Sequence, residues 1–148
     1  MAHTLTNLLT HVIFSTKDRA PLITPDLKPE MCAYLGGVVR ELEGTALNVN
    51  AVPDHVHLLV KLPPRIALSE VVGKMKASSS GWVKRKWQTD FAWQAGYGGF
   101  SVSQSNVPAV ANYIANQEQH HKRVVFREEF VAFLKKHEIE YDERYLWE

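Results

Sequence analysis

The chain has 148 residues, of which 45% are hydrophobic and 22% charged, a composition typical of a soluble globular protein with one domain over residues 1–148. Its formal net charge of +1 excludes strong overall basicity, so binding to nucleic acid would depend on a local basic patch. The single cysteine, Cys32, excludes an internal disulfide and fits a reducing cytosol. No apolar run approaches membrane-spanning length and the start of the chain lacks a signal-peptide pattern, so we expect a cytoplasmic protein with no membrane partner.

The first half of the chain predicts a strand, a helix and a β-hairpin. Thr24 and Pro25 are a typical cap and first residue of a helix, and apolar residues at helical spacing follow until Gly44. Pro53-Asp54 separates two β-branched, apolar runs and predicts the turn of the hairpin. The expected elements are a strand at 5–15, a helix between residues 25 and 44, and strands at 47–52 and 55–62.

The second half predicts one further strand and three helices. The expected elements are a helix at 69–87, an aromatic, glycine-punctuated strand within 91–102, a helix from about 106 to 122, and a last helix at 127–137. The order strand–helix–strand–strand–helix–strand predicts an α+β fold, a ferredoxin-like βαββαβ sandwich with one antiparallel sheet. The remaining helices would follow the fourth strand.

Two histidines stand one residue apart in the apolar run PDHVHLLV. Residues i and i+2 of a strand share a face and lie about 6–7 Å apart, so His55 and His57 would face outward together while their apolar neighbours face the core. Two neutral imidazoles can hold one divalent metal and leave positions open for a substrate. The alternative is that the pair is structural. A histidine-triad nucleotide hydrolase would need a third alternate histidine where Leu59 stands.

A second candidate element is the helical segment NYIANQ. Tyr113 and Gln117 are four residues apart and share one face of a helix. The amide oxygen of glutamine can be a hard metal ligand, and a tyrosine hydroxyl can be a nucleophile. The alternative is that Tyr113 is an aromatic residue on the helix surface and Gln117 is solvated. The spacing alone favours this alternative.

Basic residues concentrate on the predicted helix at 69–87, interleaved with serines and tryptophans. Cations neutralise phosphates, and hydroxyl and aromatic groups suit exposed bases, so this cluster is a candidate DNA-binding surface. The alternative for each lysine is a solvated helix face. His120 and His121 are expected to contact solvent or DNA. The candidate DNA-binding residues are Lys74, Lys76, Lys84, Arg85 and Lys86, extended near the tyrosine by Lys122 and Arg123.

Taken together and in order, these segments resemble a known family over nearly the full length. HVIFSTKDRAPL, VPDHVHLLV, the serine-rich basic helix, YGGFSVS and NYIANQEQHHKRVVFREEF are similar to the small single-tyrosine transposases of the HUH superfamily, named for histidine, hydrophobic residue, histidine. The resemblance includes relatives associated with repetitive palindromes. Relaxases and replication initiators share the histidine motif, but their chains are usually longer.

The resemblance implies a metal-dependent enzyme that cuts and rejoins single-stranded DNA. His55 and His57 would bind Mg²⁺ or Mn²⁺ with Gln117 as the third protein ligand. Tyr113 would attack a DNA phosphate, form a covalent 5′-phosphotyrosine and release a 3′-OH. Imidazole also binds Zn²⁺ or Ni²⁺, so the amide oxygen of Gln117 favours hard ions but does not exclude these two.

The same resemblance implies DNA hairpins as substrate and a homodimer in which the tyrosine helix of one subunit can complete the site of the other. The sequence reveals no dedicated base for the tyrosine proton. Two alternatives stay open: a domesticated relative that binds hairpin DNA without transposition, and a ferredoxin-like RNA-binding or regulatory domain with a structural histidine pair.

Overall fold

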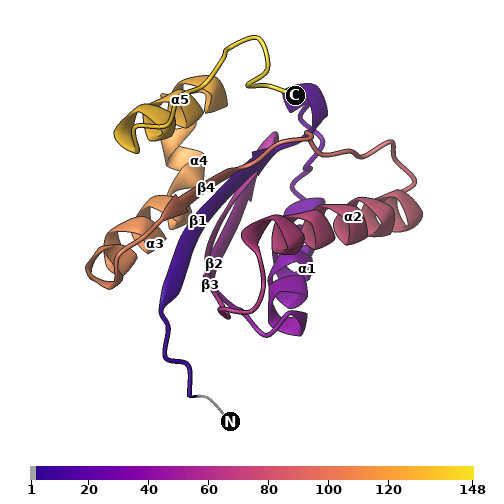
Figure 1. Cartoon of the computed structure of the whole chain (residues 1–148). Helices are drawn as coiled ribbons and strands as arrows, with labels where there is room; N and C mark the ends of the chain where they lie inside the picture. Colours follow the sequence, from indigo (N-terminus) through magenta and orange to yellow (C-terminus); the bar gives the residue numbers. More distant parts are fainter. Residues whose placement is uncertain (1–2) are drawn as a thin grey trace.

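A computed structural model describes residues 3–148 as an antiparallel sheet with helices on both of its faces (Figure 1). The strands are β1 (Leu8–Ser15), β2 (Thr45–Val52), β3 (His55–Leu62) and β4 (Gly98–Ser101). The helices are α1 (Leu27–Glu41), α2 (Leu68–Trp87), α3 (Val107–Ala115), α4 (Gln117–His120) and α5 (Phe126–Lys136), with short 3-10 turns η1 (Lys17–Arg19) and η2 (Gln104–Asn106).

The sheet has the strand order β2-β3-β1-β4, and each neighbouring pair is antiparallel. Because α1 lies between β1 and β2 in the chain, and α2 between β3 and β4, this is the ferredoxin-like arrangement that the sequence predicts. The C-terminal helices α3, α4 and α5 follow the fourth strand, also as predicted. None of the helices described in residues 3–148 is long and apolar enough to cross a membrane.

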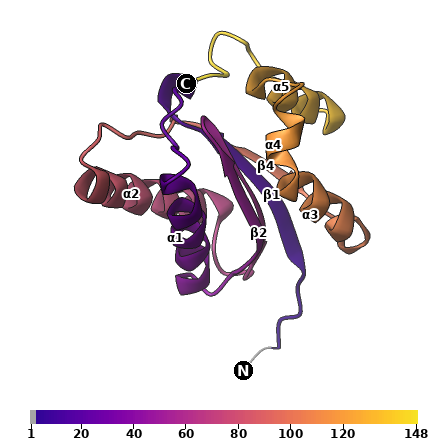
Figure 2. The same ribbon diagram turned by 180° about the vertical axis from the view of Figure 1, so that it is seen from behind.

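Helices cover the sheet on both sides (Figures 1 and 2). Helices α1 and α2 lie over one face, and α3, α4 and α5 lie over the other. Alternate residues of each strand therefore enter two different cores. The first core contains Val12, Phe14, Val56, Leu58 and Val60 of the strands, packed with side chains of α1 and α2. The second is smaller and consists of Ile13 and Phe100 packed with Phe126, Phe130 and Leu134 of α5.

This second layer changes the expected surroundings of the histidine pair. His55 and His57 do share a face of β3, opposite the face of Val56 and Leu58, as alternation predicts. That face does not point to solvent, because α3, α4 and α5 cover it, and both histidines are at most 1% exposed.

Several elements differ in extent from those predicted. The strand expected within 91–102 is confined to β4, preceded by a loop that contributes one isolated bridge between Thr16 and Trp93. The helix expected from about 106 to 122 is divided at Asn116, whose ψ of 22° leaves the helical range. The Asn116 side chain donates to the carbonyl oxygen of Asn112 at 2.9 Å, a local bond that competes with helix continuation.

Glycine brings α5 close to the sheet. A Cβ atom added at Gly98 on β4 would lie 2.7 Å from Cε1 of Phe130, so only glycine leaves room for that ring. The residue before Phe130 on α5 is Glu129. The close approach of helix and strand therefore also sets how near this carboxylate comes to the histidines of β3.

Candidate functional site

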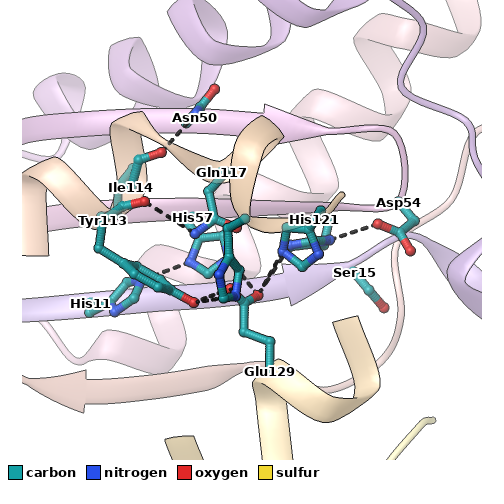
Figure 3. Close-up of polar contacts among 12 residues, drawn as sticks. His11, Ser15, Asn50, Asp54, His57, Tyr113, Ile114, Gln117, His121 and Glu129 are labelled. Carbon is teal, nitrogen blue, oxygen red and sulfur yellow. Dashed lines mark hydrogen bonds and ion pairs between the residues drawn. The ribbon is translucent and has the colours of Figure 1, made fainter. Parts of the chain in front are cut away.

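Polar side chains from four elements meet between the sheet and the C-terminal helices (Figure 3). His57 comes from β3, Tyr113 from α3, and Glu129 from α5, while His121 directly follows α4. His55, at the start of β3, joins them, and the ligand atoms of His55, His57, His121 and Glu129 all lie within 4.8 Å of one another. We call these four residues the histidine–glutamate cluster. Three of its members are buried, and the side chain of His121 is 13% exposed.

One carboxylate oxygen is the centre of the cluster. Oε1 of Glu129 lies 3.0 Å from Nε2 of His57, 3.1 Å from Nε2 of His121 and 3.3 Å from Nε2 of His55. Burial opposes ionisation of Glu129, but hydrogen bonds from His121 and His57 and the proximity of His55 hold its pKa far below the ordinary range. The carboxylate is therefore ionised at neutral pH and faces three imidazole nitrogens.

The far nitrogens of the two strand histidines are also held. Nδ1 of His55 lies 2.7 Å from Oδ1 of Asp54, and Nδ1 of His57 lies 2.8 Å from Nε2 of His11. Burial lowers the pKa of His57 to about 4 and that of His11 to about 3, so both rings are neutral at pH 7. Burial also lowers the pKa of His55, but the hydrogen bond to Asp54 and the nearby carboxylate of Glu129 outweigh it and raise the net pKa. Such outer partners fix ring orientation, as they do around histidine ligands of metals.

The tyrosine hydroxyl belongs to the same network. Tyr113 donates its hydroxyl to Oε2 of Glu129, and the oxygen lies 3.2 Å from Nε2 of His120. Burial and the charge of Glu129 raise the pKa of Tyr113 above its ordinary value, so the hydroxyl is protonated at neutral pH. The chain places this hydroxyl at its own cluster.

Gln117 is also buried at this place. It is 0% exposed, and its Nε2 donates to the backbone oxygen of Tyr113 at 3.3 Å. Its Oε1 has no hydrogen-bond partner, and neither has Nε2 of His55; they are two of the four such buried side-chain atoms in the described part of the chain. A buried polar atom without a partner is costly, and both atoms are types that bind metal ions. The residues present therefore fit a bound cation.

The structure thus brings together the four residues predicted from the sequence, Tyr113, His55, His57 and Gln117. It also adds two residues that the sequence analysis did not select, His121 and Glu129. His121, expected to contact solvent or DNA, joins the cluster because the chain turns at Asn116 and continues along the sheet. One feature of the sequence could have identified Glu129: it is the lone carboxylate on the otherwise apolar face of α5. The buried apolar residues of that face are Phe126, Phe130 and Leu134.

The predicted DNA-binding residues fall into two separate groups. Those of α2 lie on the face of the sheet opposite the cluster, whereas Lys122 and Arg123 are exposed beside α4 (Figure 2). Within α2, Lys84 and Arg85 are exposed, Lys86 pairs with Glu30, and Lys74 lies 3.9 Å from Glu70.

Lys76 has an internal role. Its Nζ donates to the backbone oxygens of Gln94 at 2.8 Å and Gly96 at 2.6 Å, which ties α2 to the loop before β4. Partial burial lowers the pKa of Lys76 to about 8. The ammonium is committed to these carbonyls rather than displayed towards a ligand.

A cleft leads to the tyrosine. It has a volume of about 540 Å³ and lies between α3 and α5, where a substrate could reach the hydroxyl of Tyr113. Residues lining it include His11, Tyr113, His120, Glu129 and Phe133, and its walls are mainly apolar.

Comparison with known proteins supplies the family. The family model described as "Transposase IS200 like" matches residues 4–117. The transposases for insertion sequence element IS200 of Salmonella typhimurium and Salmonella typhi are each 26% identical over 129 residues, which cover 82% of this chain and 84% of theirs.

Two solved structures share the fold. A candidate transposase from Deinococcus radiodurans R1 matches with a TM-score of 0.59 and 21% identity, over 79% of this chain and 95% of that one. A REP-associated tyrosine transposase bound to a REP hairpin matches with a TM-score of 0.61 and 15% identity, over 84% of this chain and 74% of that one. With the family model covering most of its length, the chain belongs to the IS200-like transposases.

Proposed function

We propose that this transposase cuts and rejoins single-stranded DNA through a covalent bond to Tyr113. The observation that carries the proposal is the position of the Tyr113 hydroxyl, which donates to Glu129 within the histidine–glutamate cluster and lines the cleft between α3 and α5. A solvated surface tyrosine would not be hydrogen-bonded to a carboxylate residue that is only 3% exposed. Nucleophilic residues are recognised by such a partner within hydrogen-bond reach.

The proposed reaction is a transesterification. The oxygen of Tyr113 attacks the phosphorus of a DNA phosphodiester and forms a new O–P bond, while the bond from phosphorus to the 3′ oxygen breaks. The phenol loses its proton and the 3′ oxygen gains one, so the products are a 5′-phosphotyrosine and a free 3′-OH. Because the phosphotyrosine keeps the energy of the phosphodiester, a 3′-OH can reverse the attack and join a new strand without ATP.

The proposal includes a divalent ion, Mg²⁺ or Mn²⁺, held by His55, His57 and Gln117. The unpartnered atoms His55 Nε2 and Gln117 Oε1 support this ligand set. When bound, the ion polarises the scissile phosphate and offsets charge that develops on its oxygens. The protein's own part is to hold the nucleophile: α3 and α4 position Tyr113 and Gln117 over β3.

The proposed substrate is a single strand next to a DNA hairpin. Two observations support it: a relative of the same fold is described as bound to a REP hairpin, and the exposed cations Lys122 and Arg123 lie near the tyrosine helix. Lys84 and Arg85 on α2 could contact a second stretch of the DNA on the other side of the sheet. We also propose a homodimer, in which each chain completes its own site and no tyrosine helix is exchanged.

A covalent-adduct assay tests the proposal. The protein is incubated with Mg²⁺ or Mn²⁺ and single-stranded DNA from both flanks of its own gene, then run on a denaturing gel. We expect a shifted band that is lost with Tyr113→Phe and with EDTA. The matched control is Tyr145→Phe, because Tyr145 is 61% exposed, lies against Arg144 and is outside the cluster; this variant should form the adduct as the parent does.

Hairpin binding without any adduct would instead favour the second candidate, a relative that binds hairpin DNA and no longer performs the chemistry. An adduct that persists in Tyr113→Phe would contradict the assignment of the nucleophile.

A further inference from the structure

We propose that His121 and Glu129 are metal ligands together with His55 and His57, so that the site has three imidazole nitrogens and one carboxylate and prefers a first-row transition ion to Mg²⁺. The inference rests on the proposed function for the presence of a divalent ion, and it replaces Gln117 in that ligand set by His121 and Glu129. The family model ends at residue 117, so both added ligands lie outside the matched segment.

The first argument is distance. Ligand atoms sit about 2.0–2.2 Å from a bound transition ion, so two neighbouring ligands are roughly 3.0–3.5 Å apart. The three Nε2 atoms of His55, His57 and His121 lie 3.0–3.3 Å from Oε1 of Glu129. The carboxylate oxygen therefore has the spacing of a neighbouring ligand to each imidazole nitrogen. All four ligand atoms lie within 4.8 Å of one another, so small movements would admit an ion between them.

The second argument is the unpartnered nitrogen of His55. Nδ1 of His55 lies 2.7 Å from Oδ1 of Asp54, and since a carboxylate oxygen accepts, Nδ1 donates. Nε2 of the same ring faces the carboxylate oxygen of Glu129 at 3.3 Å and has no hydrogen bond. A cation between these two atoms would give both a partner, and the carboxylate–histidine pair is a common support for metal ligands.

The third argument is the position of Glu129 itself. Its carboxylate is 3% exposed, and a buried anion is retained where it is paired or coordinates a metal. Its two oxygens face different groups: Oε1 faces the three imidazoles, and Oε2 accepts from Tyr113. One side chain would thereby hold the ion and position the nucleophile beside it.

The donor set decides between ions. Mg²⁺ prefers an octahedron of oxygen ligands and retains several waters, which three buried imidazoles do not provide. Imidazole suits ions such as Zn²⁺, Fe²⁺ and Co²⁺, and affinity for nitrogen sites rises from Mn²⁺ to Co²⁺. We therefore expect Co²⁺ to bind far more tightly than Mg²⁺.

The test is a titration of the full chain with Co²⁺ alone, without DNA, followed by visible absorption. We expect one ion per chain, bands that are not displaced by a hundredfold excess of Mg²⁺, and a Kd raised at least tenfold in Glu129→Gln and in His121→Ala. The matched control is His3→Ala: this histidine is exposed before β1 and outside the cluster, so the Kd of this variant should stay within threefold of the parent.

Thermal melting identifies any variant that fails to fold; His121, partly exposed at the edge of the cluster, is the substitution best tolerated. If both variants bind Co²⁺ as tightly as the parent while His55→Ala does not, the inference is overturned and the ion belongs to the pair with Gln117. No binding by the parent chain, or full displacement by Mg²⁺, also overturns it. Each result is independent of the adduct assay, whose failure would instead contradict the role of Tyr113.

Discussion

The tyrosine helix is held to the sheet by two asparagines of the edge strand β2, and we expect their removal to loosen it. Nδ2 of Asn48 donates to the backbone oxygen of Ala111, and Nδ2 of Asn50 donates to that of Ile114, each at 2.7 Å (Figure 3 for Asn50). The perturbation is the double variant Asn48→Ala/Asn50→Ala, which keeps the strand but deletes both bonds to α3.

The magnitude follows from the two bonds. A hydrogen bond contributes about 1 kcal/mol net, so the pair should stabilise docking of α3 by about 2 kcal/mol. Asn50 should contribute the larger share, because Ile114 lies in the last turn of α3, where carbonyls lack a helical partner. Since about 1.4 kcal/mol is a factor of ten, opening of α3 should become roughly 30-fold more frequent. Burial of Ile114, which is 0% exposed, still holds the helix in place most of the time.

The assay is native-state hydrogen exchange of the α3 amides. We expect exchange of these amides to rise roughly 30-fold in the double variant, while amides of β1 and β3 change less. Thr45→Ala, at an exposed position of the same strand, is the matched control and should leave α3 unchanged. Exchange of α3 within twofold of the parent, with equal global stability, would refute this account of how the helix is anchored.

Three further predictions concern the surroundings of the cluster. Gly98→Ala should lower stability by about 1–3 kcal/mol in denaturant melts, because the new Cβ meets Phe130, whereas Gly73→Ala, with nothing within 4 Å, should be neutral or stabilising. Asp54→Asn should weaken metal affinity about 10–100-fold, because it changes the hydrogen bond that orients His55. Calorimetric titration measures this affinity, and an unchanged value would argue against a supporting role of Asp54. A divalent ion at about a hundred times its Kd should stabilise the fold by about 2.7 kcal/mol in thermal melts, and EDTA should reverse the gain.

Much of the fold could be predicted because its signals are local. The apolar periodicities gave the order of strands and helices, and strand alternation correctly put His55 and His57 on one face. The spacing of Tyr113 and Gln117 selected two residues that the structure brings to that face, although the helix between them ends at Asn116.

The parts that could not be predicted depend on contacts between distant segments. Glu129 is a lone carboxylate on the apolar face of α5, but its partners are not visible in the sequence, because only the packing of α5 on the sheet brings it to the histidines. Lys76 looks like a member of a basic surface, but the loop before β4 presents carbonyls that its ammonium binds. Local sequence patterns identify residues whose side chains could bind a metal or DNA. Tertiary packing decides which of these residues meet at the site.

The delivery of Tyr113 to the cluster of its own chain has a consequence for stoichiometry. Among the described residues one such hydroxyl lies at one such cluster, so under the proposed reaction each polypeptide would carry a single DNA end at a time. Moving a DNA segment requires two ends to be severed and then exchanged. A lone molecule would have to process them one after the other, resealing or releasing the first before it takes the second. Two molecules held near each other could retain both ends simultaneously, so the advantage of pairing would lie in keeping severed strands together.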